Sequence, residues 1–299
     1  MIEMVIDGRA ADLGGGFAVS RILPFRARRM VGPFIFLDHA GPLDLPAAAR
    51  RAADVRPHPH IGLSTVTYLF SGSMTHRDSL GMTQEIAPGA VNWMTAGRGI
   101  AHSERFDGAR DGDPPLEALQ SWVALPEAAE EQAPAFDSYP ADSLPTATED
   151  GTWLRVVAGS AFGLTSPVRT HSPLFYVHAA LQPGAAIALP AGHEERAAYV
   201  AHGTVELDGR AFRAGQLLVF AAGAAPAIRA TTAATIGLLG GARLGERHIW
   251  WNFVSSRRDR IEQAKADWRD GRIPLPPNDR DEWAPLPADH RKPAPPAMS

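Results

Sequence analysis

The feature that most constrains the fold of this chain is a weak internal repeat. A tyrosine followed four positions later by a glycine, and two glycines eight positions apart, occur in that order in each half of the chain. They are found at Tyr68–Gly72 and Gly89–Gly97, and again at Tyr199–Gly203 and Gly215–Gly223. A repeat at this scale marks one structural plan used twice. Since 299 residues also suit two domains, we predict an N-terminal domain over 1–130 and a C-terminal domain over 131–299.

The local sequence favours short β-strands. Several runs are rich in β-branched and aromatic residues and are separated by glycine or proline every few positions, a pattern typical of strands joined by turns. The clearest runs are Ser64–Phe70, Val91–Met94 and Ile100–His102. A helix is indicated at Ser256–Arg269, where Ser255 or Ser256 could provide the cap, and a proline-rich extended tail follows it. We therefore predict an all-β chain with two β-barrel domains in tandem and a short C-terminal helix.

The two copies of the repeat differ in polar residues that could bind a metal ion. Positions ten and eight before the repeat tyrosine, and five and seven after the last repeat glycine, are polar in the first copy and apolar in the second. The first copy has His58, His60, His102 and Glu104; the second has Leu189, Ala191, Ile228 and Ala230. His193 lies near one of these positions but out of register, so we interpret it as a structural histidine.

The spacing of the four polar residues suits a metal site. Residues i and i+2 of a strand point to the same face, so His58 and His60 would present two imidazoles, and His102 and Glu104 an imidazole and a carboxylate. A His-x-His pair alone is a weak motif, since 11 histidines in this chain would produce about 0.4 such pairs by chance. The second pair favours a metal site over unconnected histidines. Because the chain contains no cysteine, the metal ligands must be nitrogen and oxygen atoms, and such ligands suit Fe, Mn, Ni, Cu or Zn.

Other polar and aromatic residues near these motifs have weaker interpretations. His76 and Asp78 could orient the metal ligands from behind, or could lie in a solvated hairpin turn. Asp38 and His39 end an apolar strand, where we favour a structural role. Trp250 and Trp251 are predicted to pack between the domains, because buried aromatic area contributes strongly to core stability.

Charge and hydropathy exclude several classes of function. The formal net charge is -4 and the pI is near 6.3, so no broad positive field is available to bind nucleic acid. The N-terminus lacks a basic-then-apolar signal pattern, and no uninterrupted stretch of about 18 apolar residues occurs. We therefore expect a cytoplasmic protein that binds neither nucleic acid directly nor membranes.

Five segments of the chain resemble the pirin family, a bicupin family of the cupin superfamily. They are GPFIFLDHAGP at 32–42, RPHPHIGLSTVTYLFSG at 56–72, HRDSLG at 76–81, PGAVNWMTAGRGIAHSE at 88–104 and RHIWWNFVSS at 247–256. The resemblance implies two cupin barrels, with one Fe(II) ion held in the N-terminal barrel by His58, His60, His102 and Glu104. It also implies that the C-terminal barrel holds no metal.

The resemblance further implies a quercetin 2,3-dioxygenase-type activity, in which a small aromatic flavonol reacts with dioxygen at the iron and Glu104 acts as the catalytic proton acceptor. The alternative is a non-catalytic iron-binding regulator of a transcription factor or metabolic enzyme. One departure bears on this choice. Cupins generally have a carboxylate about four residues after the His-x-His pair, and this chain has Ser64 there.

Overall fold

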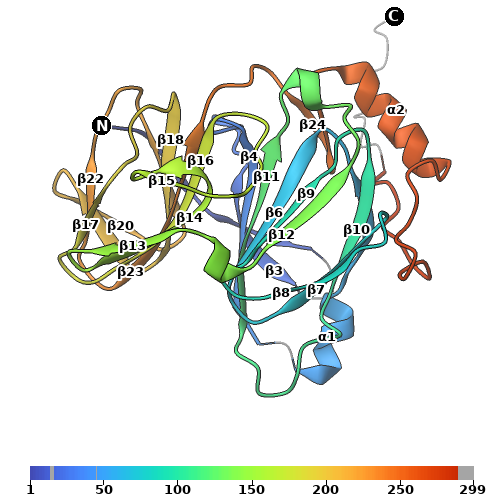
Figure 1. The fold of residues 1–299 in the computed structure, drawn as a ribbon, viewed down its shortest axis with the longest axis horizontal. Coiled ribbons are helices and arrows are strands. Elements are labelled where there is room, and N and C mark those ends of the chain that lie inside the picture. The colour runs from blue at the N-terminus through green and yellow to red at the C-terminus, as the bar shows by residue number, and fades with distance from the viewer. Residues whose placement is uncertain (14–16, 45, 289–299) are drawn as a thin grey trace, which may run out of the picture.

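The computed structural model describes residues 1–13, 17–44 and 46–288, and its elements are mostly antiparallel strands arranged in two lobes that lie side by side (Figure 1). The strands from the first half of the chain are β2 (Arg9–Asp12), β3 (Ala18–Leu23), β4 (Phe34–Leu43), β5 (Val55–His60), β6 (Leu63–Ser71), β7 (Met74–Asp78), β8 (Thr83–Ile86), β9 (Val91–Thr95), β10 (Ile100–Arg105), β11 (Leu116–Ala124) and β12 (Ala135–Tyr139). They form a seven-stranded sheet, β12-β9-β6-β11-β4-β3-β2, and a four-stranded sheet, β5-β10-β7-β8.

The other lobe repeats this plan. Its strands are β1 (Ile2–Asp7), β13 (Thr146–Glu149), β14 (Thr152–Ala161), β15 (Leu164–Thr165), β16 (Leu174–Leu181), β17 (Ala186–Ala188), β18 (Glu195–His202), β19 (Thr204–Leu207), β20 (Arg210–Arg213), β21 (Gln216–Phe220), β22 (Ala227–Ala230) and β23 (Ala234–Gly241). The large sheet runs β1-β21-β18-β23-β16-β14-β13, with β15 beside β14, and the small sheet runs β17-β22-β19-β20. The predicted all-β class is confirmed.

The structure confirms that the repeat marks equivalent elements. Tyr68 on β6 pairs with Val91 on β9, and Tyr199 on β18 pairs with Leu217 on β21. The repeat glycines all have positive φ, a conformation that glycine adopts without a steric penalty and that terminates strands in tight turns. They are Gly72, Gly89, Gly97, Gly203, Gly215 and Gly223, with φ between 51° and 89°.

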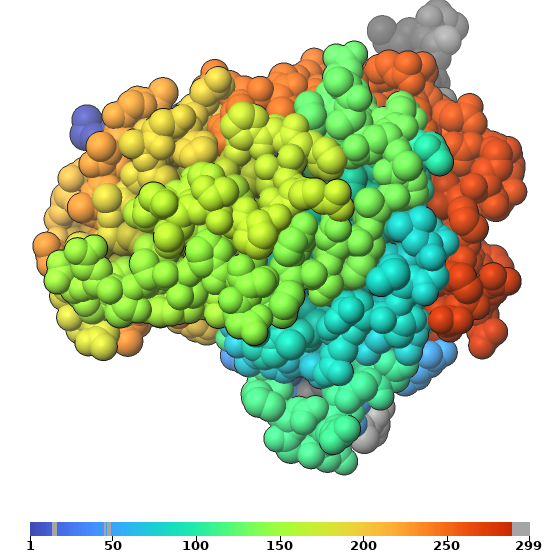
Figure 2. Space-filling view, in the orientation of Figure 1, coloured from blue at the N-terminus to red at the C-terminus, as the bar shows by residue number. Residues whose placement is uncertain are grey.

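Each lobe contains one strand from the residue range predicted for the other domain. The N-terminal strand β1 pairs with β21 in the large sheet of the C-terminal lobe, and Figure 2 shows the blue N-terminus among the orange residues of that lobe. Conversely, β12 pairs with β9 in the N-terminal lobe. The division into 1–130 and 131–299 remains a prediction, and no single cut near residue 130 separates all the sheets.

One hydrophobic core joins the two large sheets. It contains buried residues of the N-terminal lobe, such as Val66 and Tyr68, together with Val157, Tyr176 and Tyr199 of the C-terminal lobe. Burial of apolar area contributes about 25 cal/mol per Å², so a shared core holds the lobes together strongly. The two lobes are therefore neighbours through side-chain packing as well as through the pairing of β1 in the C-terminal lobe.

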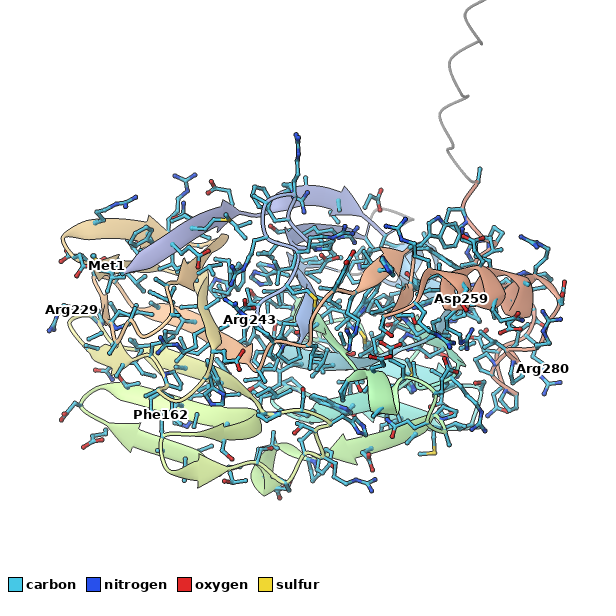
Figure 3. The ribbon with its side chains drawn as sticks, turned by 90° about the horizontal axis from the view of Figure 1, so that it is seen from above. Met1, Phe162, Arg229, Arg243, Asp259 and Arg280 are labelled. Atoms are coloured by element: carbon cyan, nitrogen blue, oxygen red, sulfur yellow. The ribbon has the colours of Figure 1, made fainter. Side chains whose placement is uncertain are left out.

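Helices cover the outside of the N-terminal lobe. The last of them, α2 (Arg258–Arg269), packs Ile261, Ala264 and Trp268 against Ile61 and Ala101, at the end of the molecule opposite Met1 (Figure 3). The predicted cap is wrong: Arg257 occupies the N-cap position and makes no side-chain cap bond.

Short elements complete the chain. The seven-residue helix α1 (Ala47–Ala53), which the sequence did not indicate, begins after a proline. Two 3-10 helices lie at Glu127–Ala129 and Ala141–Ser143, and the hairpin β24 (His248–Trp250) and β25 (Phe253–Ser255) precedes α2. Among the described residues, no helix has both the length and the apolar character needed to span a membrane.

Candidate metal centre

Two neighbouring strands of the small N-terminal sheet bring the predicted ligands together. His58 and His60 lie on β5, His102 and Glu104 lie on β10, and these strands pair with His102 directly opposite His58. The register shifts between His102 and Glu104, so β10 carries an irregularity at the site. The predicted arrangement of two facing strands with i, i+2 pairs is therefore present, with Glu104 displaced from ideal alternation.

Backbone carbonyl groups orient two of the three imidazoles. Nδ1 of His58 lies 2.9 Å from the Arg56 carbonyl oxygen, and Nδ1 of His60 lies 3.2 Å from that of Asn252. A carbonyl oxygen only accepts hydrogen bonds, so each Nδ1 carries the proton and each Nε2 presents a lone pair. Such bonds from the second ring nitrogen are the usual way in which proteins hold metal-binding histidines.

His102 is oriented by a hydrogen-bonded chain. The Asp78 carboxylate accepts hydrogen bonds from the backbone N–H groups of Leu80 and Met82, and lies 3.0 Å from Nε2 of His76. His76 therefore donates from Nε2, and its Nδ1 accepts a hydrogen bond from Nδ1 of His102 at 3.3 Å. Nε2 of His102 is left with a lone pair. His76 and Asp78 are buried behind the ligand, as in the first of the two predicted alternatives.

The three free nitrogens converge on one point. One donor nitrogen from each of His58, His60 and His102 lies within 4.8 Å of the other two, and the ring centroids are 4.4–4.9 Å apart. Nε2 of His60 and of His102 is buried without a hydrogen-bond partner, although buried polar atoms are normally paired. A cation bonded to these nitrogens would satisfy both, so the donor set fits a metal ion.

Glu104 lies beside this group. Its carboxylate oxygen Oε1 is 3.8 Å from Nδ1 of His102, and its Oε2 is buried without a hydrogen-bond partner. It is not part of the group of three donors that lie within 4.8 Å of one another. The assignment of Glu104 as fourth ligand therefore remains a prediction.

Burial sets the protonation of the site. It lowers the pKa of His58 to about 4 and holds those of His60 and His102 well below the usual value, with the neighbouring histidines contributing further. The imidazoles are thus neutral at pH 7, which is the form that binds metals. Burial raises the pKa of Glu104 to about 8, and a nearby cation would shift the carboxyl group back toward its ionised form.

Comparison with known proteins places the chain in a family. The model of the Pirin family matches residues 16–123, and that of the Pirin C-terminal cupin domain matches residues 176–274. A "Pirin-like protein" of Caulobacter vibrioides is 54% identical over 289 residues, which covers 96% of this chain and 100% of the relative. The chain belongs to the pirin family. Both lobes accordingly have the cupin fold that the sequence predicted.

Solved structures agree with this assignment. A crystal structure of a quercetin 2,3-dioxygenase from Acinetobacter baumannii has a TM-score of 0.87 to this pirin, at 34% identity, and the match covers 99% of this chain and 97% of the other. A second structure with the same protein name and organism has a TM-score of 0.81 at 26% identity, covering 92% of this chain and 98% of the other. The pirin fold thus extends over nearly the whole described chain.

A large cavity opens from the histidines of this pirin. Its volume is about 890 Å³, within the usual range for small-molecule sites, and it is lined by His58, His60, His102 and Glu104 at its base. On one wall the rings of Phe36 and Trp122 stack with centroids 4.0 Å apart, and Trp122 also contacts His60 edge-on at 5.1 Å. The sequence pattern did not single out this aromatic wall.

Polar residues complete the cavity. Arg21 forms a two-point ion pair with Asp38 at 2.8 and 3.0 Å, and its guanidinium also lies over the Phe36 ring. Asp38 therefore lines the cavity, beyond the structural role predicted for it. Trp251 lines the cavity too, while Trp250 packs near α2 with Lys265 over its ring.

The serine that replaces the usual cupin acid does not line this cavity. Ser64 is fully buried on β6, and its hydroxyl lies 3.1 Å from that of Thr95 on β9. It is not among the residues that line the cavity. Position 64 therefore supplies no carboxylate to the site, and Glu104 is the acidic residue in the predicted set of metal ligands.

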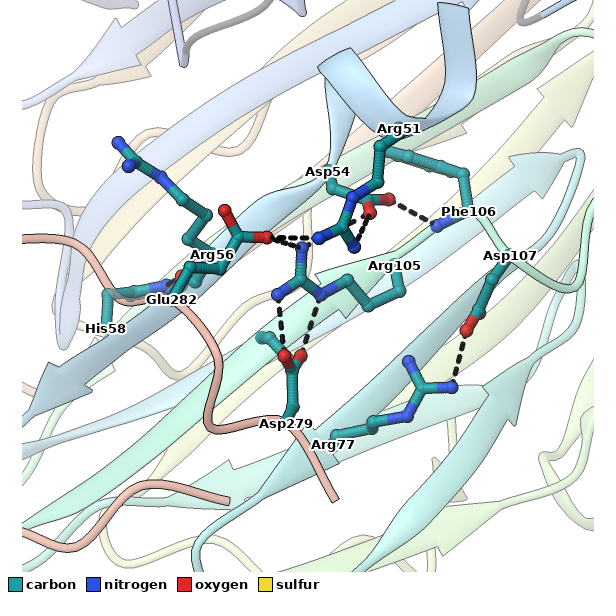
Figure 4. A network of polar contacts seen from close by, with 11 residues as sticks. Arg51, Asp54, Arg56, His58, Arg77, Arg105, Phe106, Asp107, Asp279 and Glu282 are labelled. Atoms are coloured by element: carbon teal, nitrogen blue, oxygen red, sulfur yellow. Dashed lines mark hydrogen bonds and ion pairs between the residues drawn. The ribbon is translucent and has the colours of Figure 1, made fainter. Parts of the chain in front are cut away.

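Residues of the C-terminal tail contribute to the lining of the cavity. Arg105, next to Glu104 on β10, forms ion pairs with Asp279 at 2.7 Å, Glu282 at 3.0 Å and Asp54 at 3.2 Å (Figure 4). Burial alone would lower the pKa of Arg105, but these hydrogen bonds and charges outweigh it and raise the pKa. The tail residues Glu282 and Ala284 consequently line the cavity.

Proposed function

We propose that this chain is a metal-dependent dioxygenase that acts on a flavonol-like aromatic substrate, with His58, His60, His102 and Glu104 holding one ion, most suitably Fe(II). One observation carries the proposal: three histidines, two of them with a buried nitrogen that has no hydrogen-bond partner, line a cavity large enough for a small aromatic molecule. The similar structure from Acinetobacter baumannii, which is named a quercetin 2,3-dioxygenase, supports the choice of substrate class.

Different residues around the ion would have different roles in this reaction. A bound iron would supply a Lewis acid and the redox chemistry with dioxygen. The Asn252 carbonyl and the His76–Asp78 pair hold the imidazoles in the tautomer that binds a metal. Glu104 would accept the proton of the substrate hydroxyl, for which a carboxylate within hydrogen-bond reach is needed.

The aromatic wall would orient the substrate. The stacked side chains of Phe36 and Trp122 both line the cavity, and Trp122 lies edge-on to His60. A planar aromatic molecule would bind there by burial of apolar area and by contact with these ring edges. The Arg21–Asp38 pair on the same side supplies polar groups that could bind hydroxyl groups of the substrate.

The test is metal analysis of freshly purified, untagged protein, followed by oxygen uptake with quercetin. We expect about one iron per chain and uptake that falls at least ~100-fold in His58→Ala, because the metal ion loses one of its predicted ligands. His171→Ala is the matched control, since His171 is exposed and does not line the cavity. Uptake equal in wild type and His58→Ala would contradict the proposal.

A second candidate is a non-catalytic iron-binding regulator. It is favoured by Ser64, which packs against Thr95 and leaves the site without the usual second acid. In that case the protein would retain about one metal per chain but show no uptake with quercetin. Pull-downs with oxidised and reduced protein would then recover different partners, because one added charge at the metal changes the field around it; identical partner sets would count against this candidate.

A further inference from the structure

A second group of potential metal ligands lies where the two lobes meet. His39 on β4 and Glu117 on β11 belong to adjacent strands of the N-terminal large sheet, whereas His202 ends β18 in the large sheet of the C-terminal lobe. The donor atoms of these three residues lie within 4.8 Å of one another. The group shares no residue with the cavity of the first site.

The contacts within this group suit a shared cation. Nε2 of His39 is 2.9 Å from Oε1 of Glu117, and Nε2 of His202 contacts the same oxygen. Two ligand atoms bonded to one tetrahedral zinc ion at about 2.0–2.1 Å are separated by roughly 3.3 Å. The separation of His39 and Glu117 would therefore lengthen by a few tenths of an ångström around an ion, and the contact of His202 with Glu117 would lengthen by more.

The surroundings resemble those of a built metal site. Nδ1 of His39 lies 2.9 Å from the hydroxyl of Tyr199, so the hydroxyl can accept the Nδ1 proton and leave Nε2 as a ligand. The ring of Phe70 packs edge-on against His39 and contacts His202. The side chains of His39 and Glu117 are 8% and 10% exposed, whereas that of His202 is 43% exposed and provides a route of entry.

We infer that His39, Glu117 and His202 form a second binding site for a divalent first-row metal ion, of which Zn²⁺ is the best-suited, and that this ion links the two cupin lobes. Two imidazoles and one carboxylate are a common zinc ligand set that leaves the fourth position to water. Without an ion, Oε1 of Glu117 accepts hydrogen bonds from both imidazoles, so the lobes remain in contact and the site is preformed.

A cation at this position would stabilise the arrangement of the lobes. An ion that binds the folded chain and not the unfolded one raises the melting temperature according to its concentration above Kd. For a chain of this size, occupation at about 100 times Kd corresponds to an increase of several degrees. The same increase should be absent when the bridging ligand from the C-terminal lobe is removed.

The experiment uses untagged full-length protein that has been stripped with a chelator, re-equilibrated with Zn²⁺ and freed of unbound metal. We expect two zinc ions per chain in wild type, one in His202→Gln and two in His171→Gln, the matched control with an exposed histidine replaced. The variant His58→Ala should retain the ion between the lobes and its thermal stabilisation, so this inference is tested independently of the dioxygenase proposal.

A second variant tests whether a loss of zinc binding in His202→Gln is caused by a folding defect. Glu117→Gln keeps the size of the side chain and an acceptor oxygen for the histidines, but removes the anionic ligand. We expect it to fold and to bind one zinc ion, with no zinc-dependent rise in melting temperature beyond that of the first site. If His58→Ala binds no zinc ion, or if His202→Gln and Glu117→Gln bind as many ions as wild type, the inference is overturned and the group is a hydrogen-bonded contact only.

Discussion

At the scale of single residues, the orientation and tautomer of each histidine in the first site depend on the contact that its second ring nitrogen makes. Carbonyl groups determine the tautomer of His58 and His60, and a histidine does so for His102. The last case depends on Asp78, because its carboxylate forces His76 to donate from Nε2 and to accept at Nδ1. The imidazoles are thus preorganised by groups that are not themselves predicted metal ligands.

The variant His76→Phe tests this chain of hydrogen bonds. The phenyl ring can keep the stacking with Phe136, whose centroid is 4.4 Å from that of His76, but cannot accept the His102 proton. We expect metal affinity at the first site to fall about 10–100-fold, as is typical when such supporting partners are lost. Competition titration against a chelator measures it.

Phe136→Leu is the control for that experiment, because it removes the stacked ring and leaves the hydrogen bonds in place. Its metal affinity should stay within a few-fold of wild type. Equal affinities for His76→Phe and wild type would show that His102 does not depend on His76 for its orientation.

At the scale of elements, the tail that follows α2 contributes to the site through charge. Asp279 accepts hydrogen bonds from Ser103 and from two nitrogens of Arg105, which is only 2% exposed. A buried arginine is tolerated where carboxylates surround it, and losing a partner leaves its charge uncompensated. The tail is therefore part of the folded N-terminal lobe.

Replacement of Asp279 by asparagine should destabilise the protein. We expect Asp279→Asn to lower the free energy of unfolding by about 1–3 kcal/mol, less than for a fully isolated buried charge, because Asp54 and Glu282 remain beside Arg105. Denaturant unfolding at constant metal content measures the change. Asp281→Asn, an exposed change of the same type two positions along the tail, should have almost no effect; a similar loss in both variants would contradict the role of the ion pairs.

The sequence predicted those parts of the site that depend on local periodicity. Strand alternation placed His58 with His60, and the repeat located the strand that carries His102 and Glu104. It did not predict the lobes in which β1 and β12 pair, helix α1, or the Arg105–Asp279 pair, since these depend on contacts between residues far apart in the chain. The aromatic pair Phe36 and Trp122 was missed for the same reason, because its members lie on different strands and carry no shared motif.

At the scale of the whole molecule, the contact between lobes includes a partly buried histidine that has no part in either metal site. Nδ1 of His178, on β16, lies 2.8 Å from the hydroxyl of Tyr68 on β6, and Arg155 donates a hydrogen bond to the same hydroxyl. The hydroxyl therefore donates to His178, which must be neutral to accept. Burial, assisted by the charge of Arg155, lowers the pKa of His178 to about 4.

This lowered pKa predicts that acid weakens the contact between the lobes. Below pH 6.5 the unfolded chain takes up a proton at His178 that the folded chain does not, so stability present above pH 6.5 is lost as the pH falls toward 4. A shift of this size corresponds to roughly 1–3 kcal/mol, allowing for residual solvent access to the ring. The glutamine of His178→Gln does not titrate, and its amide oxygen can still accept the hydrogen bond from Tyr68. The difference in unfolding free energy between wild type and this variant should therefore decrease by roughly 1–3 kcal/mol between pH 7 and pH 4.5. The other histidines titrate in the same way in both proteins, so their contributions cancel in this difference. A difference in unfolding free energy that stays constant with pH would mean that His178 is protonated as easily in the folded chain as in the unfolded one.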